Sequence, residues 1–585
     1  MKIKHYFGLA VIAAMTASCS SNEDLGTAGS GTGTNEAGVG YATFSINLPT
    51  TSGTRAADDP TFDPGSDYEY KVNDATLLIF KKGEPTKEGE TPKEGDYTFV
   101  ESAELGSMAP WKDPTETGVT THAKITAKLE HVDKTDGYYA LVLLNNGTGD
   151  NVKVTLPKKG DTFSAWNVDT NVNTNKDKEA TNKIANTNNG FYMANAPLFN
   201  NNNVTTLVAI DKNKIYPTEE QAAKSAATDV YVERGLAKVT LGEGTTTEKS
   251  VTSDTYQGDK VTISKWALDV TNKKAFPIHN VDGLTTEFPT IWSNDATTAS
   301  TTNKATTKRF VDNNDKTSVK RVYWGKDPNY DNKDNDKTAL KAEFNYVANA
   351  NVKEDPANPL YCLENTFNLD NMMQGQTTRI VFKATYKPAS LPKGETTFYK
   401  IGKNTAIWSE ADLRQEIKAA VASVVSGAAG KTTVTLNADK NDITAAGTHY
   451  ITADNITVTD VEAGTIEKAI TAINTQLGLK ESDKVGISTY ADGESYYIAR
   501  IKHFGDDLTS WNSGQSYGKK NLEFLGRYGV LRNNWYVLTV QSVSGPGYPS
   551  VPEVKPNTPD DEDDNYINVS VKILSWAKRS QDVNL

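Results

Sequence analysis

The last twenty residues, 566–585, read YINVSVKILSWAKRSQDVNL. Apolar and polar residues alternate at the start of this stretch, which is the period-two pattern of a strand with one buried face. The apolar positions are Ile567, Val569, Val571 and Ile573. The preceding residues, 546–565, hold five prolines and the acidic run DDEDDN. We expect this composition to stay extended and solvated, so the terminal strand can reach a neighbouring molecule.

A second stretch near the start of the chain has the same pattern. Ala42, Phe44, Ile46 and Leu48 alternate with Thr43, Ser45 and Asn47. The two stretches predict strands of similar length and polarity. The chain therefore has two candidates for one kind of position in a sheet.

Length and charge limit the classes of function. With 585 residues the chain is too long for one ordinary core, and two large β domains are the expected solution. The formal net charge is -12, from 74 acidic and 62 basic residues, and no stripe of Lys and Arg with interleaved aromatic residues occurs. This composition argues against nucleic acid as a partner.

Residues 1–19 have the pattern of an export signal. Two lysines precede a short apolar run, which small residues and Cys19 follow directly. The residues TAS before the cysteine resemble a bacterial lipobox, which implies lipid attachment to Cys19; a plain secretory signal is the alternative. The other cysteine, Cys362, is then left without an intramolecular partner, and we expect it to be a buried apolar residue.

The remainder is predicted to be mainly β. Short strands separated by turn-rich segments indicate antiparallel sandwiches rather than alternating β and α units. Arg55 lies in the turn-rich sequence PTTSGTRAADDP, the kind of exposed loop that trypsin-like proteases cut, although from the loop alone an ordinary surface arginine is the favoured interpretation. The predicted segments are a leader with the first strand at 20–55, domains at 56–245 and 246–545, a spacer at 546–565 and the terminal strand segment at 566–585.

Two helices are predicted within the second domain. Ser409 and Asp412 form a capping-box pattern, and apolar residues on one face follow as far as Gly427. A second helix is predicted from Thr465 to about Leu477. We expect both helices to support a core.

The sequence offers little for catalysis or metal binding. Six histidines are scattered, and HExxH, GxSxG, Walker and GxGxxG motifs are absent from the sequence. A pair of carboxylates for glycoside hydrolysis stays open. The segment from Asp327 to Asp336 is similar to a calcium loop but lacks the required Gly and Glu, so the EF-hand is excluded and a looser calcium site stays open.

Several stretches together resemble the fimbrillins of type V pili of Bacteroidetes bacteria, and most closely the shaft subunit family of the minor fimbrium. They are the signal ending in Cys19, GTRAAD around Arg55, YVERGLAKV, WALDVTN, YWGKDPNY, YCLENTF, VLRNNWYVLTVQSVSGPG and INVSVKILSW. The resemblance implies two transthyretin-like antiparallel β-sandwich domains with a few short helices and a C-terminal donor strand.

The resemblance also implies a route of assembly. The subunit is exported as an outer-membrane lipoprotein with palmitate on Cys19, and an arginine-specific protease of unidentified type cuts between Arg55 and Ala56. Cleavage removes the lipid together with the first strand. The terminal strand of one subunit then fills the groove left in the next. The implied removable positions are Ala42, Phe44, Ile46 and Leu48, and the implied donor positions are Ile567, Val569, Val571, Ile573 and Trp576.

The implied function is that of a structural shaft subunit of a cell-surface fimbrium that supports adhesion, biofilm formation and virulence. Its expected partners are other copies of itself, accessory anchor and tip subunits, the protease and a host or bacterial surface receptor. No enzyme activity, catalytic residue, cofactor or metal is implied. The alternatives are a surface-anchored lipoprotein adhesin or glycan-binding module that does not polymerise, and a polysaccharide-degrading enzyme.

Overall fold

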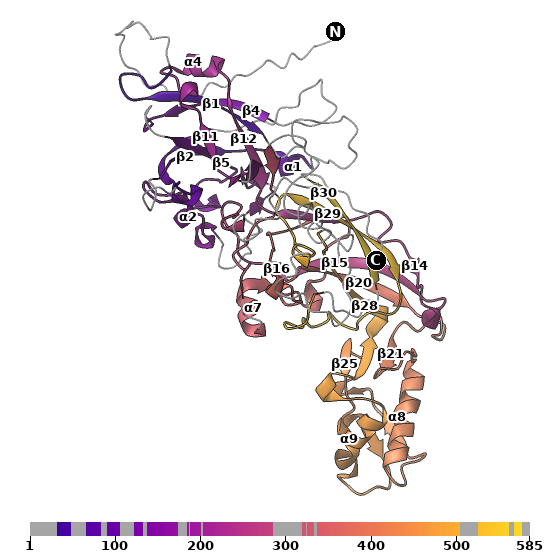
Figure 1. Cartoon of the computed structure of the whole chain (residues 1–585). Coiled ribbons are helices and arrows are strands. Elements are labelled where there is room, and N and C mark those ends of the chain that lie inside the picture. Colours follow the sequence, from indigo (N-terminus) through magenta and orange to yellow (C-terminus); the bar gives the residue numbers. More distant parts are fainter. Residues whose placement is uncertain are drawn as a thin grey trace, which may run out of the picture.

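The computed structural model describes residues 32–47, 66–83, 91–105, 122–132, 137–173, 184–186, 188–200, 203–284, 319–322, 324–332, 336–503, 524–560 and 567–575. Figure 1 shows an elongated molecule with three parts: an N-terminal β domain, a C-terminal β domain, and a smaller lobe that carries the two longest helices. The chain is mainly β and sandwich-like, which confirms the predicted fold class.

One long sheet forms the N-terminal domain. Its strands occur in the spatial order β3 (Thr98–Glu104), β2 (Ala75–Lys81), β5 (Tyr138–Leu144), β8 (Met193–Asn195), β12 (Thr228–Arg234), β1 (Gly40–Asn47) and β4 (His122–Leu129), and β11 (Val208–Ile210) pairs with β5. The path curls, because side chains of β1 pack in one cluster with Leu77 and Ile79 of β2. The two ends of the path therefore face each other across a core, as two layers of a sandwich do.

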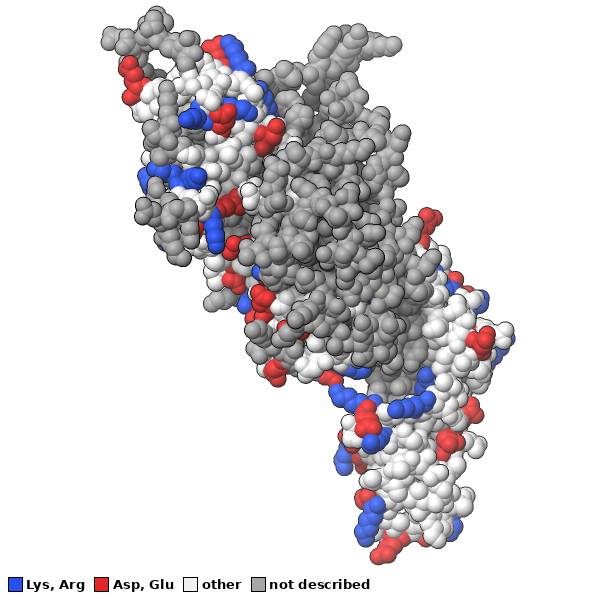
Figure 2. All heavy atoms as spheres, viewed as in Figure 1, with Lys and Arg blue, Asp and Glu red and all other residues white. Residues whose placement is uncertain are grey.

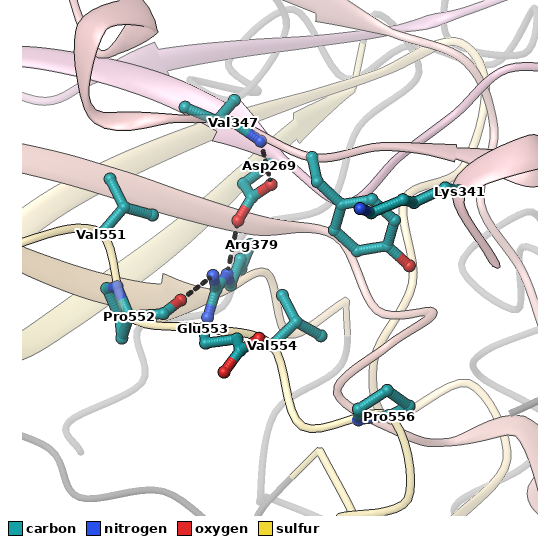
Figure 3. A pocket seen from close by; sticks show the side chains of 10 residues that line it. Asp269, Lys341, Val347, Arg379, Val551, Pro552, Glu553, Val554 and Pro556 are labelled. Atoms are coloured by element: carbon teal, nitrogen blue, oxygen red, sulfur yellow. Dashed lines mark hydrogen bonds and ion pairs between the residues drawn. The ribbon is translucent and has the colours of Figure 1, made fainter. Parts of the chain in front are cut away.

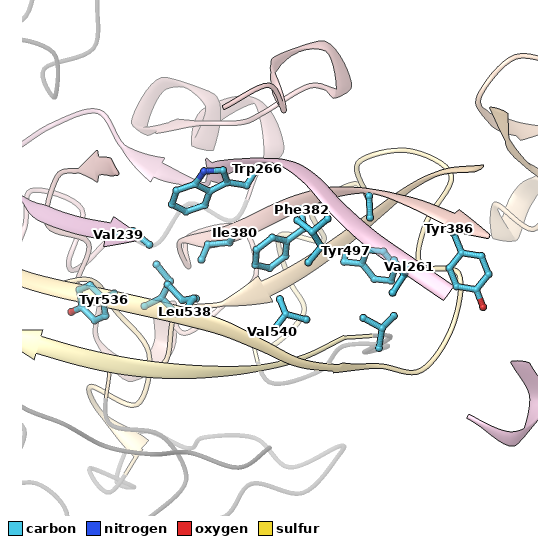
Figure 4. Close-up of a cluster of buried hydrophobic side chains, with 14 of the residues drawn as sticks. Val239, Val261, Trp266, Ile380, Phe382, Tyr386, Tyr497, Tyr536, Leu538 and Val540 are labelled. Carbon is cyan, nitrogen blue, oxygen red and sulfur yellow. The ribbon is translucent and has the colours of Figure 1, made fainter. Parts of the chain in front are cut away.

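The C-terminal domain is a sandwich of two four-stranded sheets. One has the order β19 (Leu360–Cys362), β13 (Ala237–Leu241), β29 (Asn534–Val543) and β30 (Ile567–Ser575); the other has β14 (Lys249–Ser250), β15 (Lys260–Asp269), β20 (Arg379–Lys387) and β28 (Glu494–Arg500). Val239 and Leu538 of the first sheet share a core with Trp266 and Phe382 of the second (Figure 4). Cys362 is 1% exposed and belongs to this core, as the sequence predicts.

Two strand pairs differ from the antiparallel expectation. β1 runs parallel to β12, and β13 runs parallel to β29. Each pair joins strands that are far apart in sequence, so a long crossover can connect them in the parallel sense. A period-two pattern specifies which face of a strand is buried, but it contains no information on the direction of the neighbouring strand.

The segment YVERGLAKV carries the chain from one domain to the other. β12 belongs to the N-terminal sheet, β13 belongs to the C-terminal sheet, and Gly235 and Leu236 lie between them. Nearby, Glu69 of α1 (Asp67–Tyr70) forms a buried ion pair with Lys238 at 2.8 Å and accepts a hydrogen bond from the Tyr361 hydroxyl. These contacts fix the joint, because a buried charge without its partner is strongly destabilising.

A second buried charge cluster crosses the same joint. Nδ1 of His279 lies 2.8 Å from Oε1 of Glu233 on β12, and its Nε2 lies 3.5 Å from Oε1 of Glu364. Glu364 in turn pairs with Arg532 at 3.1 Å. All four residues are buried.

The helical lobe has its own core. α8 (Glu410–Val424) begins where the capping pattern predicts, and the Ser409 hydroxyl oxygen accepts a hydrogen bond from the Asp412 amide at 3.2 Å. α9 (Thr465–Gln476) likewise matches its predicted range. Both helices pack on a small sheet of β21 (Phe398–Ile401), β27 (Ile487–Tyr490) and β25 (Gly447–His449), which projects from the C-terminal sandwich (Figure 1).

Short elements complete the described fold. The helices are α2 (Phe163–Trp166), α4 (Glu219–Lys224) and α7 (Lys337–Glu343). The remaining strands are β6 (Ala185–Asn186), β7 (Gly190–Phe191), β9 (Leu198–Asn200), β10 (Asn203–Thr205), β16 (Thr271–Asn272), β17 (Val319–Arg321), β18 (Phe344–Asn345), β22 (Thr432–Val434), β23 (Asn437–Ala438), β24 (Asn441–Asp442) and β26 (Ile456–Val458).

The visible surface mixes both signs of charge. In Figure 2, acidic and basic side chains alternate over the described parts of this face, and neither sign dominates an area there. None of the helices in the described part of the chain has the length and hydropathy needed to cross a bilayer.

Candidate functional site: strands β1 and β30

Strand β1 occupies an interior position in the N-terminal sheet. It pairs antiparallel with β4 along its whole length, from Gly40 opposite Leu129 to Asn47 opposite His122. On its other side it pairs parallel with β12, where Phe44 lies opposite Thr228. Its backbone groups therefore bond to two neighbours, and the loss of β1 would leave both neighbours with unpaired groups.

One face of β1 is completely covered. Ala42 and Phe44 are 0% exposed and Ile46 is 1% exposed, and all three belong to the main core of the N-terminal domain. These are three of the four apolar positions predicted for a removable strand; Leu48 lies outside the described residues. Burial of each large apolar side chain contributes about 1.5–3 kcal/mol to stability.

The opposite face of β1 is covered at one point by α4. Thr43 is 2% exposed, and its hydroxyl donates to the Ala222 carbonyl of α4 at 2.8 Å. The same hydroxyl lies 2.8 Å from the Thr126 hydroxyl on β4. Lys124 of β4 donates to two further carbonyls, those of Ala223 and Ser225, at 3.2 Å each. The segment around α4 thus closes over the middle of β1 and leaves room there for a small side chain.

The residues before and at the start of β1 are held by a loop after β11. The Gly33 amide donates to the Ile215 carbonyl at 2.6 Å, and Tyr41 and Tyr216 exchange two backbone hydrogen bonds of 2.8 Å. A Cβ at Gly40 would lie 2.6 Å from Cγ2 of Ile215, so this position accommodates glycine without rearrangement. Cys19, Arg55 and Ala56 lie outside the described residues.

Strand β30 lies at an edge. It pairs antiparallel with β29 from Ile567 opposite Val543 to Ser575 opposite Asn534. Among the described strands, β29 is its one neighbour. The four apolar positions predicted for a donor strand, Ile567, Val569, Val571 and Ile573, all fall within β30; Trp576 lies outside the described residues.

The pairing of β30 with β29 contains one irregularity. The adjacent apolar residues Ile573 and Leu574 suggest a bulge in the terminal strand, yet the pairing runs without a break through both of them. The irregularity lies in β29 instead, between Val540 and Ser542. Residues 567–575 form one strand.

The spacer does not behave as predicted over residues 546–560, which we call the proline strap. The prediction of a solvated, unpacked segment is wrong there. The Arg379 guanidinium donates to the Pro552 carbonyl at 2.7 Å and to Oδ2 of Asp269 at 2.8 Å (Figure 3). Val551 and Val554 pack against apolar clusters of the sandwich, and the strap forms one wall of a pocket of about 220 Å³.

The end of the proline strap is anchored as well. Asp560 is 1% exposed and accepts a hydrogen bond from the Thr377 hydroxyl at 3.0 Å. The Gln374 amide donates to the Thr558 carbonyl at 2.9 Å. The composition of the segment does not predict this packing. Proline lacks the backbone N–H but keeps its carbonyl oxygen, which can accept a hydrogen bond from a buried donor of the domain. The spacer is therefore packed on the domain as far as Asp560.

In the described part of the calcium-loop segment, the buried acid is Asp327, and backbone amides satisfy its carboxylate. The Asp327 carboxylate accepts hydrogen bonds of 2.6 Å from the amides of Asn329 and Thr366, and burial raises its pKa well above the ordinary value. The described residues contain no group of three or more His, Cys, Asp or Glu side chains placed to hold a metal ion.

Comparisons with known proteins point to one family. Residues 488–582 match the family described as "Major fimbrial subunit protein type IV, Fimbrillin, C-terminal", which covers β28, β29 and β30. The predicted resemblance to fimbrillins is confirmed over this part of the chain. No curated protein matches the chain significantly.

Two solved structures are similar at low identity. A Parabacteroides distasonis protein named for cell adhesion gives a TM-score of 0.37 at 10% identity, covering 92% of this chain and 98% of that one. A fimbrilin from Porphyromonas gingivalis gives 0.32 at 12%, covering 92% and 99%. These scores are too low for the likeness to support a shared function.

Proposed function

We propose that this fimbrillin-like chain is the structural shaft subunit of a bacterial surface fimbrium that supports adhesion and biofilm formation. It is exported as a lipoprotein through Cys19, cut after Arg55, and polymerised when the terminal strand of one copy enters the N-terminal sheet of the next. Its partners are other copies, anchor and tip subunits, and the arginine-specific protease.

The observation that supports this most is the interior position of β1. Removal of an edge strand leaves a sheet with a new edge, whereas removal of β1 leaves a slot between β4 and β12 with unpaired groups on both sides. Three apolar pockets, vacated by Ala42, Phe44 and Ile46, line one face of the slot. Such a slot requires a strand with apolar residues at every second position.

The arrangement also supplies a driving force. In its own domain β30 pairs with one described strand, β29, and in the slot it would pair with two. Each additional ladder hydrogen bond contributes about 0.5–1.5 kcal/mol net. Before cleavage β1 occupies the slot, so Arg55 acts as a covalent switch between monomer and polymer.

The decisive test is digestion of the purified precursor with an arginine-cutting protease, followed by sizing. The wild type should form ladders, while Arg55→Ala and a chain ending before Tyr566 should stay monomeric. Arg55→Lys is the matched control: trypsin should restore its ladders and a strictly arginine-specific protease should not. Ladders formed by uncut Arg55→Ala would contradict the proposal.

A second candidate function is a surface-anchored adhesin that does not polymerise. The observation in its favour is that β30 completes the sheet of its own domain. A mature protein that retains Cys19 with its lipid and stays strictly monomeric would support this candidate.

A further inference from the structure

The proposed function needs a donor strand in the slot of β1 but does not specify its register or direction. We propose that the donor strand lies in the same direction as β1, with Ser570 at the place of Thr43, Lys572 at the place of Ser45 and Leu574 at the place of Asn47. This inference rests on the proposed function. It identifies the outward face of the donor strand, and not the apolar face alone, as the part that sets register.

The place of Thr43 is the most restrictive. It is 2% exposed beneath α4, and the side chain there meets the Ala222 carbonyl and the Thr126 hydroxyl within 2.8 Å. The Ala222 carbonyl also accepts from Ser225, so it does not demand a new donor, but the space admits a small polar side chain. The outward positions of the donor strand are Asn568, Ser570, Lys572 and Leu574, and the serine is the smallest and the one with a hydroxyl.

The place of Ser45 adds a charge match. Ser45 lies opposite Asp229 of β12 and opposite Lys124 of β4. Asp229 is exposed, while the Lys124 ammonium donates to the carbonyls of Ala223 and Ser225 at the end of α4. With Ser570 at the place of Thr43, Lys572 stands beside Asp229, and opposite charges on neighbouring strands stabilise the pair.

The place of Asn47 accounts for the one outward apolar residue of the tail. Asn47 lies opposite Tyr231 of β12, which at 39% exposure is the one exposed large hydrophobic side chain of the described residues. The same register places Leu574 beside this ring. In this register Ile573 enters the core at the position of Ile46, and Leu574 covers the ring of Tyr231.

Other registers lose these matches. A shift of two residues in one direction puts Asn568 under α4, and a shift in the other puts Lys572 there and Ser575 into the pocket of Ile46. A reversed strand with Ser570 under α4 places Lys572 at the position of Tyr41, opposite Lys128 and outside the stretch that pairs with β12, so Lys572 loses Asp229. Each of these registers puts a side chain at the position of Gly40, because residues 565–575 contain no glycine, so the cost of moving Ile215 is common to all of them.

Disulfide trapping tests the register directly. In the precursor, Thr126→Cys is combined with Ser570→Cys, or with Asn568→Cys or Lys572→Cys as matched controls. After cleavage and oxidation, the pair at 126 and 570 should give covalent ladders without reductant, because cysteines directly opposite on neighbouring strands can be bridged. Covalent ladders from the 568 or 572 pair instead would overturn the register while leaving strand exchange intact. If the wild type itself forms no polymer, both proposals fail.

Charge exchange tests the direction without cysteines. Lys572→Glu should speed dissociation of the polymer by about three- to tenfold, and adding Asp229→Lys should restore the wild-type rate. Asn568→Glu is the matched control, because it changes charge on the same face away from Asp229. A Lys572→Glu polymer that Asp229→Lys weakens further would contradict the proposed direction.

Discussion

Strands β1 and β30 have the same alternating pattern and similar length, yet they hold opposite positions in their domains. β1 lies between two strands with its apolar face buried and its other face covered by α4 at Thr43, while β30 lies at an edge beside β29. The sequence pattern indicates that a strand has one buried face. The sheet topology determines how many neighbouring strands lose their hydrogen bonds when that strand is removed. Removal of a strand with two neighbours leaves a slot with unpaired backbone groups on both sides. Removal of a strand with one neighbour breaks only one ladder of hydrogen bonds.

The largest expected effect comes from the buried face of β1. Phe44→Ala in the uncut precursor should lower the free energy of unfolding of the N-terminal domain by about 4 kcal/mol, through lost burial and the cavity left behind. Chemical denaturation would measure it. Ser45→Ala, the neighbouring residue on the half-buried face, should change stability by less than about 0.5 kcal/mol. Equal effects of the two substitutions would mean that β1 is not seated in the core.

The second prediction concerns the anchor ahead of β30. Arg379→Leu leaves the buried Asp269 carboxylate without its partner and should cost about 3 kcal/mol, with faster amide hydrogen exchange across the proline strap. Lys383→Ala, on the same strand with a half-exposed partner in Glu494, is the control and should cost about 0.5 kcal/mol. An unchanged exchange rate in the strap would show that Arg379 does not hold it.

The third prediction concerns the pH dependence of the stability of the N-terminal domain. Burial raises the pKa of Glu94 from 4.5 to about 7, although the Thr206 and Leu207 amides that donate to its carboxylate lower it. The folded state therefore favours the protonated form. This contribution to the stability of the N-terminal domain is complete below pH 4.5 and is lost as pH rises through 7, by about 3 kcal/mol.

Glu94→Gln should remove that dependence, because its amide oxygen accepts the same hydrogen bonds without titrating. The measurement is denaturant unfolding at pH 4.5 and pH 8 for both proteins. A slope that persists in Glu94→Gln would assign the effect to other groups.

The smallest expected effect tests the cover over β1. Thr43→Val keeps the shape of the side chain and removes its hydroxyl, and should cost about 1 kcal/mol in the uncut precursor. Thr126→Val and the double variant complete a double-mutant cycle. A coupling energy near zero would mean that the two hydroxyls do not interact.

Much of the architecture could be predicted from local pattern. The start of α8 follows from its capping residues, the range of α9 follows from its apolar periodicity, and β1 and β30 follow from alternation. These features depend on neighbouring residues in the sequence. The parallel pairing of β1 with β12 depends on residues far apart, and no local pattern encodes it.

The docked proline strap and the cover over Thr43 could not be predicted for a related reason. The contact of Arg379 with Pro552, and that of Thr43 with Ala222, use a backbone carbonyl, which every residue carries. Carbonyl acceptors leave no mark in the sequence. Asp229, Tyr231 and Leu574 can be read from the sequence. Their proposed roles follow only from the register of β12 beside β1, which the sequence does not show.

The passage from β12 to β13 has a mechanical consequence. β12 forms one wall of the slot and continues through Gly235 and Leu236 into β13, which pairs with β29. In a fibre stretched end to end, force applied at the slot would act parallel to β12 and β13. All hydrogen bonds of their ladders would then share the load, and the bonds would not break one at a time. A filament built in this way should resist flow and withstand load without covalent links between its subunits.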